Sequence, residues 1–132
     1  MSGETNLNSL LKNMTPIINE GEYVFCTIPA LTGIDVSDII GSFKEAEGIT
    51  VILNKHIADN LKLKYTYIAS WITLTVHSSL EATGLTAAFA TALAKEGISC
   101  NVVAAYYHDH IFVDKKNAEK AIEALRNLSA RS

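Results

Sequence analysis

The chain has 132 residues, of which 48% are hydrophobic and 19% are charged. That length suffices for one compact domain, or for two small units that share a core, and no low-complexity tract indicates disorder. The net charge of −3 and the lack of a lysine and arginine cluster argue against binding to a nucleic-acid backbone. We therefore predict a packed globular protein that has no nucleic-acid partner.

The opening segment, MSGETNLNSLLKN, contains no basic stretch followed by a long apolar run. We therefore expect neither a secretory signal nor a transit peptide. No other apolar segment approaches the length needed to cross a bilayer, so the sequence predicts a cytoplasmic protein without a membrane partner. Cys26 and Cys100 lie in apolar, strand-like contexts, where buried small hydrophobic residues are more common than a disulfide.

The first half of the chain is predicted to contain a helix, a strand, a hairpin and a short helix. Apolar residues recur at helical spacing from Asn6 to Ile18, which predicts an amphipathic helix that ends before Gly21. The stretch EYVFCTI is rich in aromatic and β-branched residues and stops at Pro29, which is typical of a strand. The remaining elements are a loop over Ala30 to Ser37, a hairpin with arms Ile39 to Glu47 and Ile49 to Asn54, and helical turns over His56 to Leu63.

The second half shows a clearer pattern. Polar and apolar residues alternate from Ala69 to Val76, which predicts a strand with one buried face. An alanine-rich helix follows and ends at Gly97, and Asp114 is a natural N-cap for a last helix. Between them we expect strands over Ile98 to Tyr106 and Ile111 to Val113, separated by a polar turn at His108, Asp109 and His110.

The order of these elements predicts an α+β fold. The second half runs strand, helix, strand, strand and helix, and the first half runs helix, strand, hairpin and short helix. Each half therefore looks like a ferredoxin-like βαββαβ unit that lacks one strand. A half of this size buries too little surface to stand alone, so we expect the two halves to share or exchange strands. The prediction is an antiparallel sheet with helices on one face, divided into an N-terminal half, 1–68, and a C-terminal half, 69–132.

The junction between the strand ITLTV and the alanine-rich helix is the most informative segment. A helix start offers unpaired backbone N–H groups and a partial positive charge, and Gly84 would let a ligand carboxylate approach the backbone. Alternatively, Ser78-Ser79-Leu80-Glu81 forms a capping box, so that the helix begins at Ser79 and Gly84 lies in its second turn. The local signals do not decide between these two helix starts.

The run GLTAAFATALAKEGISCNVVAAY resembles the ACT-domain pattern, in which a glycine opens the first helix and a Gly-Ile pair begins the next strand. The longer stretch VHSSLEATGLTAAFATALAKEGISCNVVAAYYHDHIFV resembles tandem ACT proteins of bacteria that are related to the cytosolic arginine sensors of the TOR pathway. The segments EYVFCTIP and FKEAEGITVIL match the first half of the same group. The resemblance thus covers most of the chain and favours a helix that begins at Gly84.

The resemblance implies two ACT units that bind an amino acid, with no catalytic residues and no cofactor. The ligand-binding positions of the family would fall on Gly84, Leu85 and Thr86 at the helix start, and on Tyr106, His108 and Asp109 after the second strand. In the arginine sensors an aromatic residue precedes the aspartate, whereas here His108 does, a difference that bears on the side-chain pocket and on the ligand. Because ACT-like units expose sheet edges and helix faces, we also expect a homodimer.

The residues alone allow two other chemistries. His108, Asp109 and His110 could bind zinc with His77 as a further ligand, but alternation along a strand would turn Asp109 away from both histidines, so a polar turn is favoured. His77, Ser78 and Glu81 could form a nucleophilic site, although a loop and a helix cap explain them better. We therefore predict no metal site and no enzyme.

Two functions from different classes remain. The first is a regulatory module that binds an amino acid and changes its dimer or partner contacts when it is occupied. The second is a structural or adaptor protein that has lost the ligand and acts only through self-association.

Overall fold

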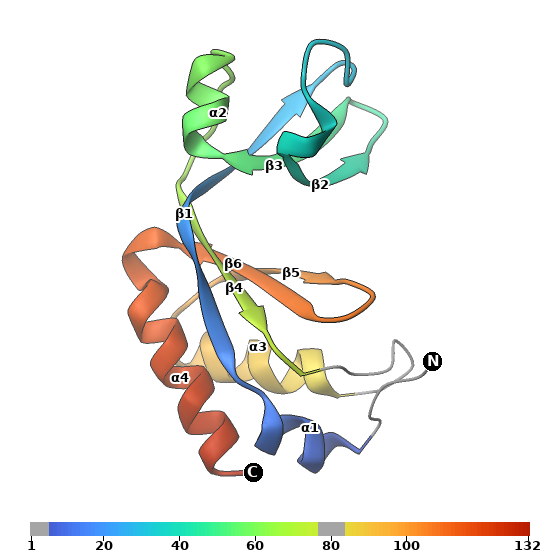
Figure 1. Ribbon diagram of the computed structural model, residues 1–132. Coiled ribbons are helices and arrows are strands. Elements are labelled where there is room, and N and C mark those ends of the chain that lie inside the picture. The colour runs from blue at the N-terminus through green and yellow to red at the C-terminus, as the bar shows by residue number, and fades with distance from the viewer. Residues whose placement is uncertain (1–5, 77–83) are drawn as a thin grey trace. The chain divides into compact units, whose positions relative to one another are not determined.

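The computed structural model describes residues 6–76 and 84–132, which fold into two compact units (Figure 1). Unit 1 combines Met1–Asn19 with Ser70–Ser132, whereas unit 2 is the continuous segment Glu20–Ala69. The described elements, in chain order, are α1 (Leu7–Asn13), β1 (Pro16–Ile28), the 3-10 turn η1 (Val36–Asp38), β2 (Ile39–Lys44), β3 (Ile49–Asn54), α2 (Lys55–Asn60), β4 (Ala69–Leu74), α3 (Leu85–Lys95), β5 (Cys100–Ala104), β6 (Asp109–Asp114), the 3-10 turn η2 (Lys115–Asn117) and α4 (Ala118–Ala130).

The strands hydrogen-bond in the order β2-β3-β1-β4-β6-β5. β3 is antiparallel to both β1 and β2, and β5 is antiparallel to β6. In unit 1 the elements β4, α3, β5, β6 and α4 follow one another as βαββα, and the first residues of β1 supply the missing fourth strand beside β4. The rest of β1 belongs to unit 2. The predicted α+β class with two ferredoxin-like units that share a strand is therefore confirmed.

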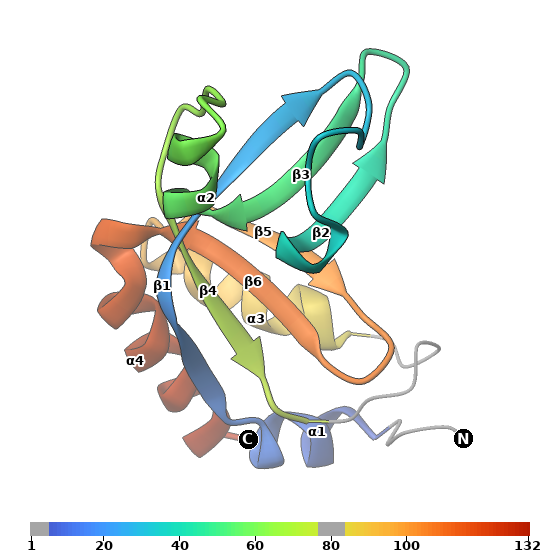
Figure 2. The same cartoon turned by 45° about the horizontal axis from the view of Figure 1, so that its top comes forward.

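Unit 1 is stabilised by an apolar layer between its sheet and its helices. In both views α3 and α4 cover the same face of the strands (Figures 1 and 2). Each large side chain buried here contributes roughly 1.5–3 kcal/mol. The buried cluster consists of Leu10, Leu11, Met14, Ile72, Leu74, Val76, Leu85, Phe89, Leu93, Ile98, Ile111, Val113, Ala121 and Leu125.

Unit 2 has a smaller core because it has fewer helical residues to cover its strands. Alternate residues of β1 and β3 point to one face and meet α2. The first helix of a βαββαβ unit is replaced here by a loop that contains only the three residues of η1. The buried cluster consists of Val24, Cys26, Ile28, Val51, Leu53 and Ala58.

The predicted first helix is wrong at its C-terminal end. α1 stops at Asn13, and Pro16 already begins β1. Proline disfavours the helical conformation of the residue before it and has no N–H for a helical hydrogen bond, so the helix cannot pass this point. Gly21, expected to end the helix, lies inside β1 instead, with φ at +111°.

The end of α3 agrees with its prediction. Gly97 follows the helix with φ at +74°, and its N–H donates to the carbonyl of Ala94 at 2.9 Å. The N–H of Ile98 donates to the carbonyl of Leu93 at 3.0 Å. Together these two bonds are the pattern of a Schellman C-cap, which directs the chain from α3 into the next strand.

Candidate functional site

The start of α3 has no side-chain cap in the part of the chain that the structure describes. Gly84 is the N-cap residue with φ at +90°, and it makes no side-chain cap hydrogen bond. The first helical bond runs from the N–H of Ala88 to the carbonyl of Gly84, at 2.9 Å. The preceding N–H groups, from Leu85 to Ala87, therefore have no partner within the helix. This end of the helix carries partial positive charge and favours an anionic group.

The side chains at this helix start differ in exposure. Leu85 is 3% exposed and belongs to the core of unit 1, so only its backbone can contact a ligand. Thr86 is exposed, and its hydroxyl can donate and accept hydrogen bonds. The helix begins where the family resemblance favours it. The capping-box residues Ser78, Ser79 and Glu81, together with His77, lie outside the described residues.

Gly84 has a close neighbour on α1 that the sequence did not reveal. A Cβ atom at position 84 would lie 3.1 Å from Cδ2 of Leu7. This contact is tighter than ordinary packing, and the positive φ adds strain for any side chain. The space beside Gly84 in this direction is therefore filled by Leu7, and a larger residue here would destabilise unit 1 whether or not a ligand binds.

The predicted polar turn between β5 and β6 is displaced along the sequence. The turn spans Ala105 to His108 and is closed by a 3.1 Å hydrogen bond from the N–H of Ala105 to the carbonyl of His108. Asp109 and His110 are already part of β6, where they pair with Ala104 and Val103. The expectation that all three polar residues form the turn is wrong for Asp109 and His110.

Asp109 is an unusual residue because it is acidic and yet buried, with only 6% of its surface exposed. It lies two residues before Ile111, and alternation along β6 therefore directs it to the face that packs against α3 and α4. Burial raises the pKa of the Asp109 carboxyl, and the nearby charge of His108 opposes this shift. A buried carboxylate without a cation is costly, so an ammonium or guanidinium group would be bound favourably here.

The neighbouring side chains of the turn are more accessible. Tyr106 is 54% exposed and packs edge-to-face against Tyr107, with ring centroids 4.9 Å apart. His108 is half-buried, and its Nδ1 atom is buried without a hydrogen-bond partner among the described residues. Such an orphan ring nitrogen can be satisfied by a ligand or by water.

The two groups of predicted site residues come from one unit. In both ribbon views the β5–β6 turn and the start of α3 lie at the same end of unit 1 (Figures 1 and 2). The arrangement combines N–H donors, which suit a carboxylate, with a buried acceptor, which suits a cation. A free amino acid carries both groups, a carboxylate and an ammonium.

A second polar cluster, which the sequence did not indicate as a unit, lies on the opposite face of the sheet. Trp71 donates from Nε1 to Nδ1 of His110 at 3.0 Å, and Thr73 lies 3.1 Å from the same nitrogen. Asn19 donates to the Thr73 hydroxyl at 2.9 Å. Burial, and then the charge of His108, lower the pKa of His110. In the sequence, this cluster was indicated only by the alternation that places Trp71 and Thr73 on the same face of their strand.

The position of His110 in this cluster bears on the zinc site that the sequence allowed at His108, Asp109 and His110. Nδ1 of His110 is engaged by Trp71, and alternation turns Asp109 to the other face. In the described parts of the chain, no group of three or more histidine, cysteine, aspartate or glutamate residues could hold a metal ion. Cys26 is buried in unit 2 and Cys100 is half-buried in unit 1, and both are free thiols.

Across residues 6–76 and 84–132, none of the helices is long and apolar enough to span a bilayer.

The shared strand and the βαββα order of unit 1 define a tandem of two small ferredoxin-like units, and sequence profiles identify their family. Two profiles of the ACT domain match this chain, one over residues 2–70 and the other over residues 67–127. The chain therefore belongs to the ACT-domain family, and it carries two such domains in tandem. A search of curated proteins found no match.

Solved structures support the same fold. A Vibrio cholerae protein of unknown function, a possible transport protein, is 48% identical, with a TM-score of 0.84 over 93% of this chain and 95% of that one. The regulatory subunit of aspartate kinase from Thermus thermophilus, without ligand, has a TM-score of 0.59 at 10% identity over 86% of this chain and 95% of that one. Aspartate kinase from Clostridium acetobutylicum has a TM-score of 0.61 at 11% identity, over 89% of this chain and 34% of that one. At such low identity the two kinase likenesses establish the fold alone.

Proposed function

We propose that this protein is a regulatory module without catalytic activity that binds a free amino acid in unit 1. The observation that carries this proposal is the buried Asp109, the first residue of β6, because the β5–β6 turn and the start of α3 lie at the same end of unit 1 (Figure 1). In the proposed complex the ligand carboxylate accepts hydrogen bonds from the N–H groups of Leu85 and Thr86. Its ammonium group, or a basic side chain, contacts Asp109.

Tyr106 and His108 complete the proposed site. The exposed ring of Tyr106 would cover the ligand side chain, and the orphan Nδ1 of His108 would bind a polar atom of the ligand. The relation to the arginine sensors, suggested by sequence, makes arginine and lysine the first ligands to test. Because His108 stands before the aspartate, where the sensors have an aromatic residue, the other amino acids are tested in the same screen.

The test is a thermal-unfolding screen against the twenty amino acids. A ligand present at a hundred times its dissociation constant should stabilise the native protein by roughly 2.7 kcal/mol. Asp38→Asn in unit 2, which removes the same charge far from the proposed site in sequence, is the control and should retain the full response. An unchanged melting temperature with every amino acid would reject the proposal. It would favour the alternative, an adaptor that acts only through self-association.

We also propose a homodimer in the cytoplasm as the functional form. Unit 1 ends at two strand edges, and uncovered edges are a common route to association. Light scattering should give about twice the chain mass of 14.3 kDa. A monomer at high concentration, with and without ligand, would reject this part of the proposal.

A further inference from the structure

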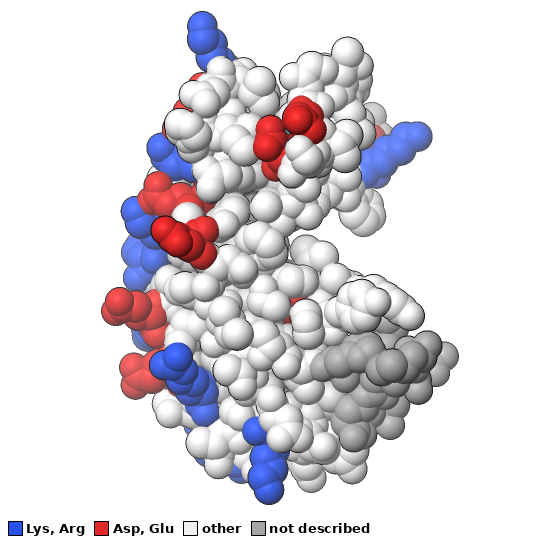
Figure 3. Space-filling view, in the orientation of Figure 1, with Lys and Arg blue, Asp and Glu red and all other residues white. Residues whose placement is uncertain are grey.

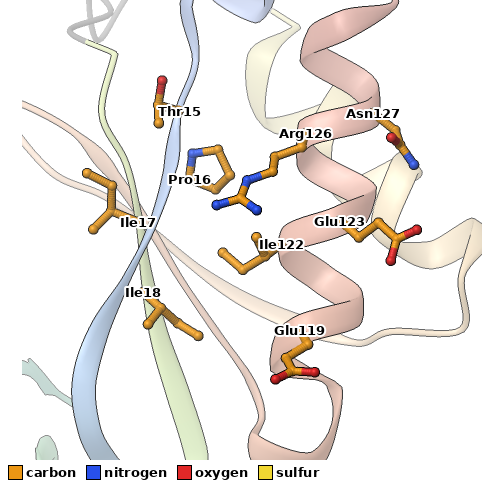
Figure 4. A pocket seen from close by; sticks show the side chains of 9 residues that line it. All are labelled: Thr15, Pro16, Ile17, Ile18, Glu119, Ile122, Glu123, Arg126 and Asn127. Carbon is orange, nitrogen blue, oxygen red and sulfur yellow. The ribbon is translucent and has the colours of Figure 1, made fainter.

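An open groove runs between the start of β1 and the exposed face of α4, entirely within unit 1 (Figure 4). Its volume is about 740 Å³. Pro16 and Ile18 point from β1 toward the helix, and Ile122 points back toward the strand. We call this feature the β1–α4 groove.

The strand beside the groove is an edge strand at this point. β3 pairs with β1 only from Tyr23 to Ile28, and β4 lies on the other side of β1. The N–H of Thr75, just after β4, donates to the carbonyl of Thr15 at 2.9 Å. Backbone groups alternate in direction along a strand, so the N–H and C=O of Ile18 point away from β4, toward the open edge.

The open edge is protected against pairing only at its start, where Pro16 has no N–H to offer. Edge strands are commonly guarded by charged side chains, by bulges or by covering elements. Here Ile17 is 49% exposed and Ile18 is 46% exposed. An edge with two exposed isoleucines and outward-facing backbone groups favours an occupant that contributes a strand of its own. The groove beside it presents both apolar and charged side chains to that occupant.

We propose that the occupant is a second copy of this chain, whose β1 pairs antiparallel with β1 across a two-fold axis, with Ile18 opposite the partner's Ile18. This inference specifies the interface of the dimer proposed above, and it rests on that dimer. The two sheets would then continue through the β1 edges, and the two α4 helices would lie side by side above them.

The backbone chemistry of β1 selects this register. With Ile18 on the axis, Pro16 stands opposite the partner's Glu20. Pro16 has no N–H to donate, which would leave an acceptor unsatisfied in most registers. The carbonyl of Glu20, however, already accepts a hydrogen bond from the hydroxyl of Tyr23, at 2.6 Å. Pro16 therefore lies opposite a carbonyl, that of the partner's Glu20, whose hydrogen bond is already supplied by Tyr23 of its own chain. The N–H of the partner's Glu20 can donate to the carbonyl of Pro16.

The charges of α4 are also self-complementary. Glu119 and Arg126 lie at opposite ends of the groove, with Ile122 between them (Figure 4). A two-fold axis near Ile122 exchanges these ends, so that each Arg126 faces the partner's Glu119. Figure 3 shows charged side chains of both signs along the side of unit 1 that carries α4. A surface of one sign would repel its own copy, whereas this mixed one does not.

The experiment measures the dimer dissociation constant by light scattering and analytical ultracentrifugation. Ile18→Asp should weaken the dimer at least a hundredfold, because it brings two carboxylates together on the axis. Val103→Asp is the matched control, since Val103 is 41% exposed and lies on β5, the other edge strand of unit 1. It should leave the dissociation constant unchanged. Circular dichroism and melting temperature verify that both variants fold.

A charge-reversal cycle tests the α4 contact on its own. Glu119→Arg and Arg126→Glu should each weaken the dimer about tenfold, because each places like charges opposite one another. The double variant restores opposite charges and should return the dissociation constant to within about threefold of the wild type. Two losses that add in the double variant would overturn the proposed antiparallel contact.

The outcomes separate this inference from the function proposed above. A dimer that is broken by Val103→Asp and kept by Ile18→Asp would move the interface to β5 and overturn only the present inference. A monomeric wild type would overturn both the dimer and its interface. The amino-acid screen on folded, monomeric Ile18→Asp reports the ligand site separately, and a retained response would support an interface distinct from that site.

Discussion

The two units match the same family, yet they differ in the segment after their first strand. In unit 1 the chain enters α3, a helix of 11 residues whose start has no side-chain cap. In unit 2 the corresponding segment contains only η1, whose first turn is closed by Asp35 through a 3.0 Å bond from the N–H of Ser37. Among the described residues, a helix after the first strand is therefore a property of unit 1 alone, and so is the anion site that we propose at its start. A repeated fold thus need not repeat every element.

The largest effect should come from the core that α3 brings to unit 1. Phe89 is fully buried in that core. Phe89→Ala should lower the free energy of unfolding by about 3–5 kcal/mol, because it removes buried apolar surface and leaves a cavity. Trp71, the only tryptophan, reports unit 1 by fluorescence during urea unfolding.

Phe43→Ala is the matched control for that experiment, because Phe43 in unit 2 is 73% exposed. Its loss should change the free energy of unfolding by no more than about 0.5 kcal/mol. Equal effects of the two variants would contradict the burial on which the comparison of the units depends.

The second prediction concerns Asp109. Asp109→Asn should weaken amino-acid binding about tenfold or more, since a charge-assisted contact contributes about 1.5–3 kcal/mol. Burial raises the native pKa of this carboxyl. The unfolding free energy therefore falls as the pH rises from about 3.9 through the native pKa, and the cost is fully present only above that native pKa.

The asparagine variant removes that cost. It should therefore be at least as stable as the wild type at pH 7 and gain no advantage at pH 3. Calorimetric titration and urea unfolding at both pH values measure the two effects. Equal affinities would remove Asp109 from the site, whereas a large loss of stability at pH 7 would indicate a structural role for the carboxylate.

The third prediction compares two glycines with positive φ in unit 1. Gly84→Ala and Gly97→Ala should each cost about 1–2 kcal/mol of stability, because both residues have left-handed backbone conformations. Only at Gly84 would the new Cβ also press on Leu7, at 3.1 Å. Gly84→Ala should therefore cost more.

Leu7→Ala provides the test of that excess, because it removes the atoms that a Cβ at position 84 would meet. The penalty of Gly84→Ala should shrink in the Leu7→Ala background, while the penalty of Gly97→Ala stays the same. Thermal unfolding of the single and double variants completes the cycle. An unchanged penalty at both glycines would show that backbone strain alone decides the cost.

The smallest effect should come from His110, on the other face of the sheet. Burial lowers its pKa, so the unfolded chain binds the proton more readily than the native protein does. The free energy of unfolding therefore falls as the pH decreases below about 6.5 toward the native pKa. His110→Gln should flatten this dependence between pH 8 and pH 5, whereas the exposed His56→Gln in unit 2 should leave it in place. Urea unfolding at a series of pH values measures both.

The sequence predicted most elements because their signals are local. Gly97 ends α3 through its own conformation, and the alternation in β4 places Ile72 in the core and Trp71 on the opposite face. The extension of the first helix to Ile18 was wrong because Met14 and Ile18 continue the helical spacing of the leucines. Pro16, which overrides that spacing, was the decisive residue.

The site could be predicted only in part, for a different reason. The family resemblance indicates Gly84 and Asp109 as positions of interest, and no local pattern shows that Asp109 is buried or that His108 has an orphan nitrogen. The polar character of Asp109 instead suggested a turn. The contact between Leu7 and Gly84 joins residues far apart in the chain, so it depends on the fold as a whole.

The way β1 passes from one unit to the other has a consequence for the order in which the chain folds. Unit 2 is continuous, whereas unit 1 must bring the segment before Glu20 to the segment after Ala69. Ser129, at the end of α4, donates from its hydroxyl to the carbonyl of Lys12 in α1, a bond across 117 positions. Contacts of such long range form slowly, because the loop between them must close before they stabilise anything. We therefore expect unit 2 to form first during refolding, and unit 1, with its helix start and Asp109, to be completed last.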